Sequence, residues 1–369
     1  MGERIIVLGG GIVGLASAFE CQRRGFDVTL VEKVKCGGQA SGAAAGMLAP
    51  YSEIGEDPDD FFRLCLESLN LYPKWQEEVK HVSKLDFEFS NSGSLHCVYH
   101  EADLLALETR QQWQGQFGAK AEILEGERLF SLEPELSRDI IAAMHYPQES
   151  HVFAPDYVKA LEEGCRNLGV EIFDELEEVY IESWKEDVQL KSKDGQVFKG
   201  DKLIVSNGAW AKELEDVFGL NIPVYPIRGQ ICAYEIPVGK VEHIIYTSQG
   251  YLVPKANGTL VNGASEDIAG FNTTVTEKGI NRLTNWNKNV FPFLAKENPF
   301  HTWAGLRPAT QDGFPLIGKL EGAPHIIFAT GHYRNGILLS AVTGTIVADL
   351  LDGKPDRVPL TLFKPERFS

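Results

Sequence analysis

The amino-acid sequence predicts an α/β (α+β) fold in which a Rossmann-like domain is combined with a second, mainly antiparallel-sheet domain. The first observation is a strand, glycine turn, helix and second strand within residues 4–31, the unit that begins dinucleotide-binding sheets. The second is that short apolar runs, typical of buried parallel strands, occur at 4–9, 202–205 and 326–329. The third is that the segments between these runs have an antiparallel pattern. We therefore expect two domains that are each discontinuous along the chain.

The composition indicates a globular protein with an acidic surface. Of the 369 residues, 43% are hydrophobic and 24% charged, and the formal net charge is −17. The length exceeds that of a usual single core. An acidic exterior repels phosphate backbones and anionic lipids, so we expect neither nucleic acid nor a membrane as partner. An anionic substrate would then need local Arg or Lys groups.

The cysteine pattern and the start of the chain favour a cytoplasmic protein. The six cysteines include no C-x-x-C pair and are expected to be reduced thiols. The first strand begins almost at Met1, which leaves no room for a signal peptide. The most apolar stretch, 336–351, contains Asp349 and hydroxyl side chains, and it is shorter than the roughly 18 residues that span a bilayer. It is expected to be a buried helix.

The N-terminal unit carries a dinucleotide-binding loop. Residues 9–14 read Gly-Gly-Gly-Ile-Val-Gly, which satisfies G-x-G-x-x-G between the strand at 4–9 and the helix at 12–24. Gly9 permits the tight turn, Gly11 lets backbone approach a pyrophosphate, and Gly14 lets helix and strand pack closely. Glu32 ends the second strand (27–31), where its carboxylate can accept hydrogen bonds from ribose hydroxyls. This loop alone does not separate FAD from NAD.

The remaining segments alternate between the two patterns. We expect helices at 59–80, 102–117, 125–132, 155–168, 276–290 and from 336 onward, and strands within 85–99 and at 170–173, 202–205 and 326–329. Residues 188–190 and 197–198 read as a hairpin, and 230–234, 250–254 and 259–263 as an antiparallel sheet. We place the Rossmann-like domain at 1–85, 145–220 and 298–369, and the antiparallel domain at 86–144 and 221–297.

Three later segments carry a family resemblance. Residues 37–48 (GGQASGAAAGML) form a small-residue loop that resembles the flavin-contacting loop of the D-amino-acid oxidase superfamily. Residues 304–318 (AGLRPATQDGFPLIG) are similar to its late R-P-x-T-x-D-G-x-P-x-I-G segment. Residues 331–339 (GHYRNGILL) match the G-H-x-R-N-G-I-L-L turn of its glycine-oxidase branch, which is linked to thiamine synthesis. The resemblance spans the chain from residue 4 to about 351, and the last two motifs are long and specific.

The resemblance implies non-covalent FAD. Bulky groups at 42–46 would prevent a flavin from lying against backbone, and a helix beginning near Gly336 would stabilise reduced flavin if it points at the ring. Sarcosine oxidases attach FAD through a C-terminal cysteine, whereas the last cysteine here, Cys232, precedes Arg307. The residues expected to hold FAD are Gly9, Gly11, Ile12, Val13, Gly14, Glu32, Lys33, Ala40, Ser41, Ala45, Gly46, Met47, Glu178, Val179, Gly208, His332, Tyr333, Arg334, Asn335, Gly336, Ile337 and Leu338.

The resemblance also indicates the substrate site. Arg307 lies in a rigid apolar stretch, and by resemblance it grips the substrate carboxylate as a bidentate anchor. Tyr246, Tyr251 and Arg334 are the further catalytic candidates, although each could instead serve packing or brace a turn. The pocket is expected to include Met47, Ala49, Gln249 and Glu266. Gln249 stands where a His is found in the best-known pattern and Glu266 where a Met is found, which leaves the amine selectivity open.

The implied activity is oxidation of glycine, sarcosine and small D-amino acids to a 2-oxo acid, ammonia and hydrogen peroxide. The α-carbon hydride passes to the flavin, and no side-chain base is needed if the amine binds neutral, so positioning carries the rate. Oxygen then reoxidises the flavin. The imine is hydrolysed or passed to thiazole synthesis, which makes thiazole synthase a candidate partner. The family suggests a homotetramer.

Rival readings remain open at this stage. The chain could be a D-amino-acid oxidase or dehydrogenase with a different substrate range, a non-catalytic FAD-binding protein, or an NAD-dependent dehydrogenase. We expect no metal site, because His96 and His100 lie in a strand-like context without a cluster of further ligands.

Overall fold

The computed structural model describes residues 2–54 and 58–369 and confirms the predicted mixed α/β class. The first unit consists of β1 (Arg4–Leu8), α1 (Ile12–Arg23) and β2 (Asp27–Val31), with β1 and β2 paired in parallel. β1 is buried on both faces, as expected for a strand of branched apolar residues in a parallel sheet.

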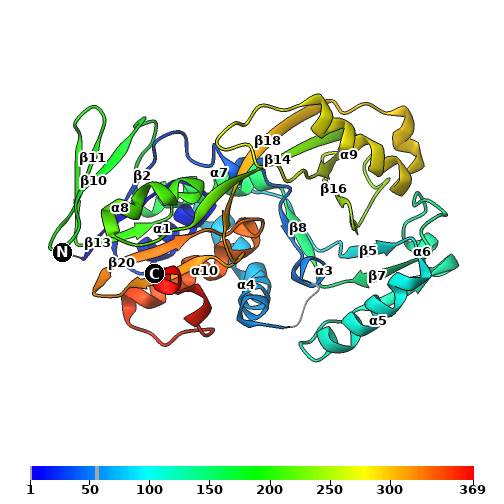
Figure 1. The fold of residues 1–369 in the computed structure, drawn as a ribbon, viewed down its shortest axis with the longest axis horizontal. Coiled ribbons are helices and arrows are strands. Elements are labelled where there is room, and N and C mark those ends of the chain that lie inside the picture. Colours follow the sequence, from blue (N-terminus) through cyan, green and yellow to red (C-terminus); the bar gives the residue numbers. More distant parts are fainter. Residues whose placement is uncertain (1, 55–57) are drawn as a thin grey trace.

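A six-stranded sheet organises one part of the molecule (Figure 1), in the order β19-β20-β13-β1-β2-β9. All neighbours pair in parallel except β19, which pairs antiparallel with β20 at the edge. The apolar runs that the sequence predicts as parallel strands therefore lie side by side. The further members are β9 (Glu171–Phe173), β13 (Lys202–Val205), β19 (Leu316–Leu320) and β20 (Ala323–Thr330).

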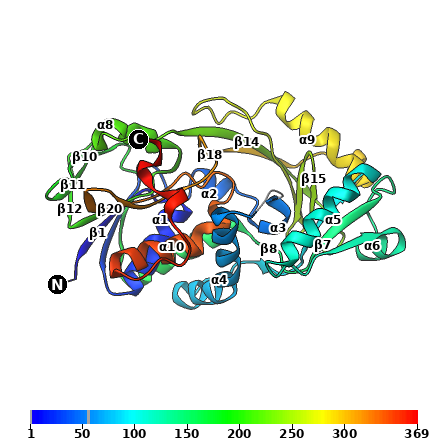
Figure 2. The same cartoon turned by 60° about the horizontal axis from the view of Figure 1, so that its bottom comes forward.

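Alternate residues of this sheet face two different layers. Ile5 and Val7 face a core that they share with a group of packed helices, which Figure 2 shows below the sheet. Ile6 and Leu8 face a second core, shared with the three-stranded sheet β10-β11-β12. The helices are α1, α4 (Asp60–Ser83), α7 (Ala154–Leu168) and α10 (Gly336–Asp352), and the strands are β10 (Val179–Ser183), β11 (Val188–Ser192) and β12 (Val197–Gly200).

An eight-stranded sheet forms the other part, in the order β18-β14-β17-β16-β15-β5-β7-β6. It is antiparallel apart from the parallel pair β15 and β5. α6 (Gly126–Leu132) and α9 (Glu277–Val290) share one core with this sheet, and α5 (Glu101–Gly115) shares another. Its strands are β5 (Ser94–Val98), β6 (Glu122–Glu125), β7 (Ala142–Tyr146), β14 (Val224–Glu235), β15 (Ile244–Thr247), β16 (Gly250–Pro254), β17 (Thr259–Gly263) and β18 (His301–Thr310).

Short elements complete the chain and supply much of the site. A small sheet has the order β3-β8-β4, and its central strand β8 is labelled in Figure 1. The elements are β3 (Met47–Leu48), β4 (Phe89–Ser90), β8 (Ser150–Val152), α2 (Ala40–Ala43), α3 (Pro50–Glu53), α8 (Glu215–Phe218) and the 3-10 turns at 208–214, 292–296, 361–363 and 365–368.

The pairing of the long strands β14 and β18 is the main feature that the sequence does not reveal, because it predicts a strand only at 230–234 of β14 and none at β18. They pair with each other over ten positions, from Val224 with Thr310 to Ala233 with His301. Gly229 is opposite Gly305 and Pro226 is opposite Pro308, and both residue types weaken the local strand signal. The two strands can pair here because each glycine or proline of one strand stands opposite the same residue type of the other. The predicted helices, the hairpin and the antiparallel trio are confirmed, with small shifts at their ends.

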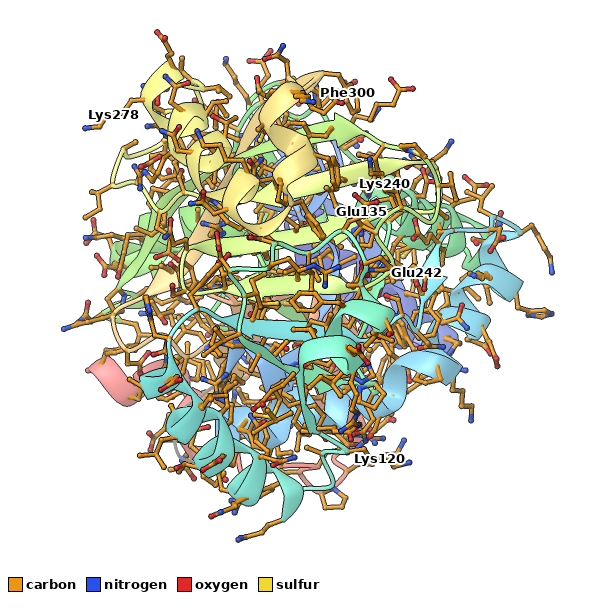
Figure 3. All side chains as sticks on the ribbon, turned by 90° about the vertical axis from the view of Figure 1, so that its right-hand side faces the viewer. Lys120, Glu135, Lys240, Glu242, Lys278 and Phe300 are labelled. Carbon is orange, nitrogen blue, oxygen red and sulfur yellow. The ribbon has the colours of Figure 1, made fainter. Side chains whose placement is uncertain are left out.

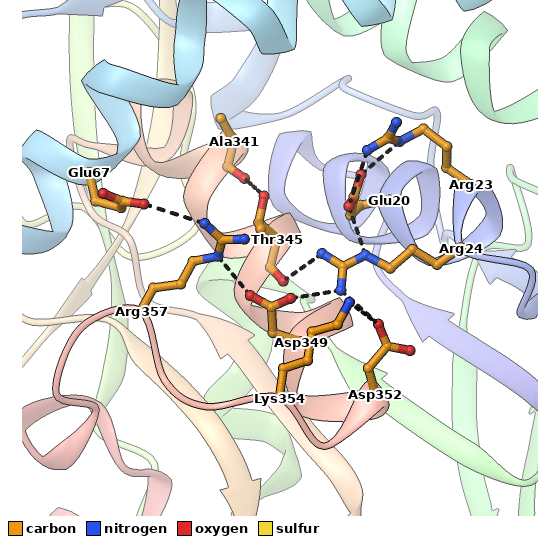
Figure 4. Close-up of polar contacts among 10 residues, drawn as sticks. All are labelled: Glu20, Arg23, Arg24, Glu67, Ala341, Thr345, Asp349, Asp352, Lys354 and Arg357. Atoms are coloured by element: carbon orange, nitrogen blue, oxygen red, sulfur yellow. Dashed lines mark hydrogen bonds and ion pairs between the residues drawn. The ribbon is translucent and has the colours of Figure 1, made fainter.

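A network of ion pairs joins the ends of two helices that are far apart in sequence (Figure 4). Arg24, just after α1, contacts Glu20 and also reaches Asp349 and Asp352 at the end of α10, at 2.7 and 2.8 Å. Arg357 contacts the other oxygen of Asp349 at 2.7 Å. Asp349 is 7% exposed, so its charge is compensated by two guanidinium groups rather than by water.

The surface carries many charged side chains. In Figure 3, which faces the side of the eight-stranded sheet, Lys278 lies at the edge of the view, whereas Glu135, Lys240 and Glu242 lie near one another closer to its middle. Within the described ranges, no helix is both long and apolar enough to cross a membrane. α10, the most apolar helix, is instead buried, as the sequence predicts. All six cysteines are buried and free of disulfides.

Candidate functional site

A large cavity lies where the parallel strands end. The residues that follow β1, β2, β13 and β20 all line it, as expected for the carboxyl edge of an open parallel sheet. β14 and β18 supply the opposite wall with Gly229, Ile231 and 305–308. The cavity therefore lies between the two large sheets.

The glycine loop after β1 has the geometry that the motif predicts. Gly9 has φ +112°, and a Cβ there would lie 2.4 Å from the carbonyl oxygen of Ser206. A Cβ on Gly14 would lie 1.9 Å from the carbonyl oxygen of Gly9, so only glycine lets α1 start this close to β1. Gly11, Ile12 and Val13, at the N-terminus of α1, line the cavity, and this end of a helix favours anions such as phosphates.

Glu32 and Lys33 form the wall next to this loop. One carboxylate oxygen of Glu32 accepts a hydrogen bond from the Gly10 N–H at 2.7 Å, and the other accepts one from the Val34 N–H at 2.9 Å. Glu32 thus braces the glycine loop besides facing the cavity. The Lys33 ammonium lies 3.9 Å from the ring centroid of Trp210. Burial lowers the pKa of Lys33.

A second helix N-terminus faces the same cavity. The turn after β20 places Gly331, His332, Tyr333 and Arg334 on the wall, and α10 begins immediately after it. Gly331 and Tyr333 have positive φ angles of 75° and 47°, so the turn is tightly bent. His332 makes a 3.0 Å hydrogen bond with Thr343 inside α10, and burial lowers its pKa to about 3, so it is neutral.

The small-residue loop is packed closely against neighbouring backbone and lines the cavity. Gly46 has φ +83°, and a Cβ there would lie 2.0 Å from the Val152 carbonyl oxygen. Lys255 fixes this loop, since its buried ammonium donates hydrogen bonds to the carbonyl oxygens of Ala45 and Val152 at 2.7 and 2.9 Å. Burial lowers the pKa of Lys255 to about 7. Gly305 of β18 packs directly against this loop, since a Cβ there would lie 2.7 Å from the Cβ of Ala43.

Arg307 projects from β18 into the cavity beside a glycine. A Cβ on Gly229 would lie 2.6 Å from Cζ of Arg307, so Gly229 makes the space that the guanidinium occupies. Its Nη1 donates a 2.9 Å hydrogen bond to the carbonyl oxygen of Ser265. Among the described residues, no carboxylate lies within ion-pair distance of Arg307, so its charge is available to a ligand.

Tyr246 and Tyr251 stand opposite each other on β15 and β16, with ring centroids 6.1 Å apart. Directly opposed residues of antiparallel strands share one face of a sheet. Tyr251 lines the cavity, and Tyr246 lies behind it, where its hydroxyl donates a 2.5 Å hydrogen bond to Glu53. Burial raises the pKa of both tyrosines, so both hydroxyls stay protonated.

Arg334 lies between two carboxylates. Its Nε is 3.9 Å from Glu53, and its Nη1 is 3.8 Å from Glu266. Glu266 also accepts a 2.8 Å hydrogen bond from the Tyr333 hydroxyl. The charge of Glu53 is the largest cause that raises the pKa of Arg334, so Arg334 is permanently charged.

Most of the predicted site residues come together in this cavity. The predicted residues that line it are Gly9, Gly11, Ile12, Val13, Glu32, Lys33, Ala40, Ser41, Ala45, Gly46, Met47, Val179, Gly208, Tyr251, Arg307, His332, Tyr333, Arg334, Gly336 and Ile337.

Eight predicted residues are outside this lining. Gly14 packs α1 against β1, Ala49 is buried at the start of α3, and Tyr246 lies behind Tyr251. Glu266 is 52% exposed and reaches the site through Arg334 and Tyr333. Gln249 lies in the exposed turn between β15 and β16, so here it does not form a wall of the cavity. The other three are Glu178, Asn335 and Leu338.

Sequence reasoning missed several side chains of the site, of which Trp210 and Glu53 are the most informative. Trp210 follows the carboxyl end of β13, and the rule that ligands bind at strand ends could have identified it. Glu53 follows the small-residue loop without any motif of its own. Only the side-chain contacts of the folded chain reveal that its carboxylate reaches Tyr246 and Arg334.

A comparison with protein families decides what this cavity serves. A family model described as "FAD dependent oxidoreductase" matches residues 4–350, almost the whole chain. The chain belongs to this family. The cavity and its two helix N-termini therefore lie in a member of a family of FAD-dependent enzymes.

Individual relatives are similar along almost the whole of this chain. The glycine oxidase of Bacillus licheniformis is 31% identical over 365 residues, 98% of this chain and 96% of that protein. A "bifunctional protein ThiO/ThiG" of Synechocystis sp. is 31% identical over 99% of this chain, which covers 54% of that longer protein. The crystal structure of glycine oxidase from Geobacillus kaustophilus superposes with a TM-score of 0.93 at 29% identity and covers 99% of both chains. The predicted resemblance to glycine oxidases is confirmed.

The residues of the cavity fit FAD. Two helix N-termini supply N–H groups and partial positive charge for the pyrophosphate and for a reduced ring. The small residues at 43–46 and residues 305–308 of β18 both line the cavity, so backbone rather than bulky side chains faces a flat ring there. Glu32 and Lys33 stand where the ribose and adenine end of a dinucleotide reaches the second strand of such a sheet.

The absence of a metal site stays a prediction. Cys36, Glu162 and Asp174 place potential ligand atoms within 4.8 Å of one another. Cys36 is buried, and burial raises the pKa of its thiol, which disfavours the thiolate that a metal would require. Groups of this kind are common in proteins without an ion.

Proposed function

We propose that this protein is a glycine oxidase that acts on glycine, sarcosine and small D-amino acids. The observation that carries the proposal is Arg307. It is a charged guanidinium on the cavity wall, held by Gly229 and Ser265 and without a carboxylate partner among the described residues. Such a group binds a carboxylate through two parallel hydrogen bonds. Tyr251 beside it limits the space for a side chain on the α-carbon.

We assign the domains as the sequence predicts them. Residues 1–85, 145–220 and 298–369 would bind FAD, and residues 86–144 and 221–297 would contribute the substrate side. The exception is β18, which carries Arg307 and would serve the substrate side because it pairs with β14. The two helix N-termini, Glu32, Lys33 and the small-residue loop would hold FAD without a covalent bond. All six cysteines are buried, and the last of them, Cys232, precedes Arg307, whereas sarcosine oxidases attach FAD through a C-terminal cysteine.

The chain's own residues would act by positioning. Arg307 would fix the substrate carboxylate and Tyr251 would donate a hydrogen bond to it, so that the α-carbon faces the ring site near Gly46 and Gly305. Holding the α-carbon and the oxidising ring in the correct orientation lowers much of the entropic part of the barrier. Bound FAD would supply the oxidising group that takes a hydride and is regenerated by dioxygen, with hydrogen peroxide as product.

No histidine of the cavity wall is suited to act as a base. His332 is buried and bonded to Thr343, and its pKa of about 3 keeps it neutral and weakly basic. We therefore propose that the amine is oxidised in its neutral form, with its proton lost to solvent before the chemical step. The imine product would then hydrolyse to the 2-oxo acid and ammonia, or methylamine when sarcosine is the substrate.

We further propose a link to thiazole synthesis in the cytoplasm. The support is the similarity to a bifunctional ThiO/ThiG protein, in which a region like this chain is part of a longer polypeptide. A thiazole synthase is therefore the candidate protein partner, and a homotetramer is the proposed assembly.

The test is anaerobic mixing of the FAD-loaded protein with single amines while the flavin absorbance near 450 nm is followed. Glycine and sarcosine should bleach the flavin, and admission of oxygen should restore it with one hydrogen peroxide per turnover. Bleaching by larger D-amino acids but not by glycine would indicate a D-amino-acid oxidase instead. Bleaching that oxygen does not reverse would indicate a dehydrogenase, and no bleaching by any amine would indicate a non-catalytic FAD-binding protein.

A further inference from the structure

Two arginines reach the substrate end of the cavity, but only one of them is free. Arg307 and Arg334 both line the wall, and both act on the ionisation of Tyr251. Arg307 has no carboxylate partner among the described residues, whereas Arg334 lies near Glu53 and Glu266. Two free guanidiniums in one pocket would suit a ligand with two carboxylates. The carboxylates beside Arg334 therefore decide which ligands the pocket accepts.

Glu53 is the more effective of the two carboxylates. Its side chain is 8% exposed, whereas that of Glu266 is 52% exposed. A charge screened by water contributes little, while a buried one acts at full strength on its neighbour. Consistent with this, Glu53 is the largest cause of the raised pKa of Arg334, and Glu266 ranks below both tyrosines.

The position of Glu53 is built into the fold. Its carboxylate accepts the 2.5 Å hydrogen bond from Tyr246 on β15. The preceding residue, Ser52, donates its backbone N–H at 2.8 Å and its hydroxyl at 2.5 Å to the buried carboxylate of Glu149. Ser94 donates to the same carboxylate. α3 is thus anchored on both sides, and Glu53 points into the cavity rather than toward solvent.

We propose that Glu53 is a specificity-determining residue that neutralises Arg334 and so restricts the site to amino acids with a single carboxylate. Arg307 then serves as the carboxylate anchor, and a second carboxylate on the substrate would meet Glu53 instead of a free cation. The inference deepens the proposed function, on which it rests for the nature of the substrate. It assigns to Glu53 a role that the sequence motifs do not reveal.

The test uses carboxylates that cannot be oxidised, so that binding is measured without turnover. Acetate and malonate are titrated into the FAD-loaded protein, and each dissociation constant is read from the change in flavin absorbance. The protein should prefer acetate. Glu53→Gln should shift the ratio of the two constants toward malonate by about tenfold, which corresponds to ~1.4 kcal/mol. An unchanged ratio in an FAD-loaded Glu53→Gln protein would overturn the proposal.

Two further variants separate this role from a merely structural one. The double variant with Glu53→Gln and Arg334→Gln should lose the gain for malonate, because the gain depends on the freed guanidinium. A gain that persists without Arg334 would also overturn the proposal. Glu266→Gln is the matched control, and its shift should be below about threefold because Glu266 is exposed; a shift as large as that of Glu53→Gln would contradict the assignment.

A milder variant covers the case in which Glu53→Gln does not retain FAD. Tyr246→Phe removes only the hydroxyl that orients Glu53, and it should shift the ratio in the same direction by a smaller factor. A ratio unchanged in this variant as well would reject the proposal. Since neither acetate nor malonate is oxidised, these results are independent of whether glycine proves to be the substrate. Failure of glycine to bleach the flavin would reject the proposed function alone.

Discussion

At the scale of single residues, the position of Arg307 depends on the absence of a side chain at its neighbour Gly229. The guanidinium of Arg307 occupies space that a side chain at Gly229 would fill. Its Nη1 is held by a backbone carbonyl oxygen, which orients the group without neutralising it. A charge that is oriented and unpaired contributes more to ligand binding than one already engaged in an ion pair.

Arg307→Ala should raise KM for glycine by orders of magnitude, because loss of a charge-assisted contact to a carboxylate costs ~2–5 kcal/mol. Steady-state oxygen uptake at varied glycine measures this. Arg307→Lys keeps the charge but loses the planar fork, so it should recover only part of the affinity. A KM within about threefold of the unaltered protein, with FAD retained, would remove Arg307 from the anchor role.

Glu149 predicts a dependence of stability on pH. Burial raises its pKa from the ordinary value of 4.5 to about 7, despite the hydroxyl groups that donate to it. A group whose pKa is higher in the folded state stabilises the fold below its unfolded pKa, and this contribution is lost as the pH rises through the folded pKa. The loss should therefore occur between about pH 4.5 and 7.

The measurement is urea unfolding of the unaltered protein and of Glu149→Gln across this pH range. The difference between their free energies of unfolding should change by up to about 3 kcal/mol. Above pH 7 the difference should be constant. A difference that does not vary between pH 4.5 and 7 would show that Glu149 does not titrate in this window.

At the scale of elements, two helices that face the cavity are tied together at their far ends. α1 and α10 both direct their N-termini at the cavity, and their C-terminal ends meet in the network around Arg24 and Asp349 (Figure 4). Carboxylates at the C-terminus of α10 are unfavourable for its dipole, and the guanidiniums of Arg24 and Arg357 offset this.

Asp349→Asn should destabilise the fold by about 2 kcal/mol, since it leaves two guanidiniums next to each other without the carboxylate between them. Thermal or urea unfolding measures the change. Asp352→Asn is the control, because Asp352 is 26% exposed and should cost less than about 1 kcal/mol. Equal losses for both variants would show that burial of Asp349 is not what matters.

At the scale of the whole molecule, the cavity exists because two sheets meet. The carboxyl edge of the six-stranded sheet supplies one wall, and the paired strands β14 and β18 supply the other. The proposed cofactor would lie between them, so its binding should stabilise both parts at once. All six cysteines are buried, and none of them lines the cavity, so none is placed to bond to the cofactor.

FAD should therefore be released when the protein unfolds. Acid precipitation of the yellow protein should leave all the flavin in the supernatant, where its absorbance is read. Free FAD added to the apoprotein should also raise its thermal midpoint in a concentration-dependent manner. Yellow colour that stays in the washed pellet would demonstrate a covalent link and contradict the proposed mode of binding.

The sequence determined the local units. Gly9, Gly14 and Glu32 are adjacent in the structure because the strand, turn and helix that carry them are continuous in the chain, so periodicity and glycine spacing were sufficient. The late segments at 304–318 and 331–339 similarly indicated the family, because a long contiguous motif can be recognised without knowledge of the tertiary structure. The buried helix at 336–352 followed from its composition alone.

Only the tertiary structure decided which charges meet. Glu53, Tyr246, Glu266 and Arg334 come from four separate segments, and no spacing in the sequence relates them. Whether an arginine is free or neutralised depends on side chains within about 4 Å, where Coulomb interactions are strong and burial sets their strength. The sequence therefore identified Arg307 and Arg334 alike as candidates, and only their three-dimensional neighbours distinguish the free anchor from the neutralised one.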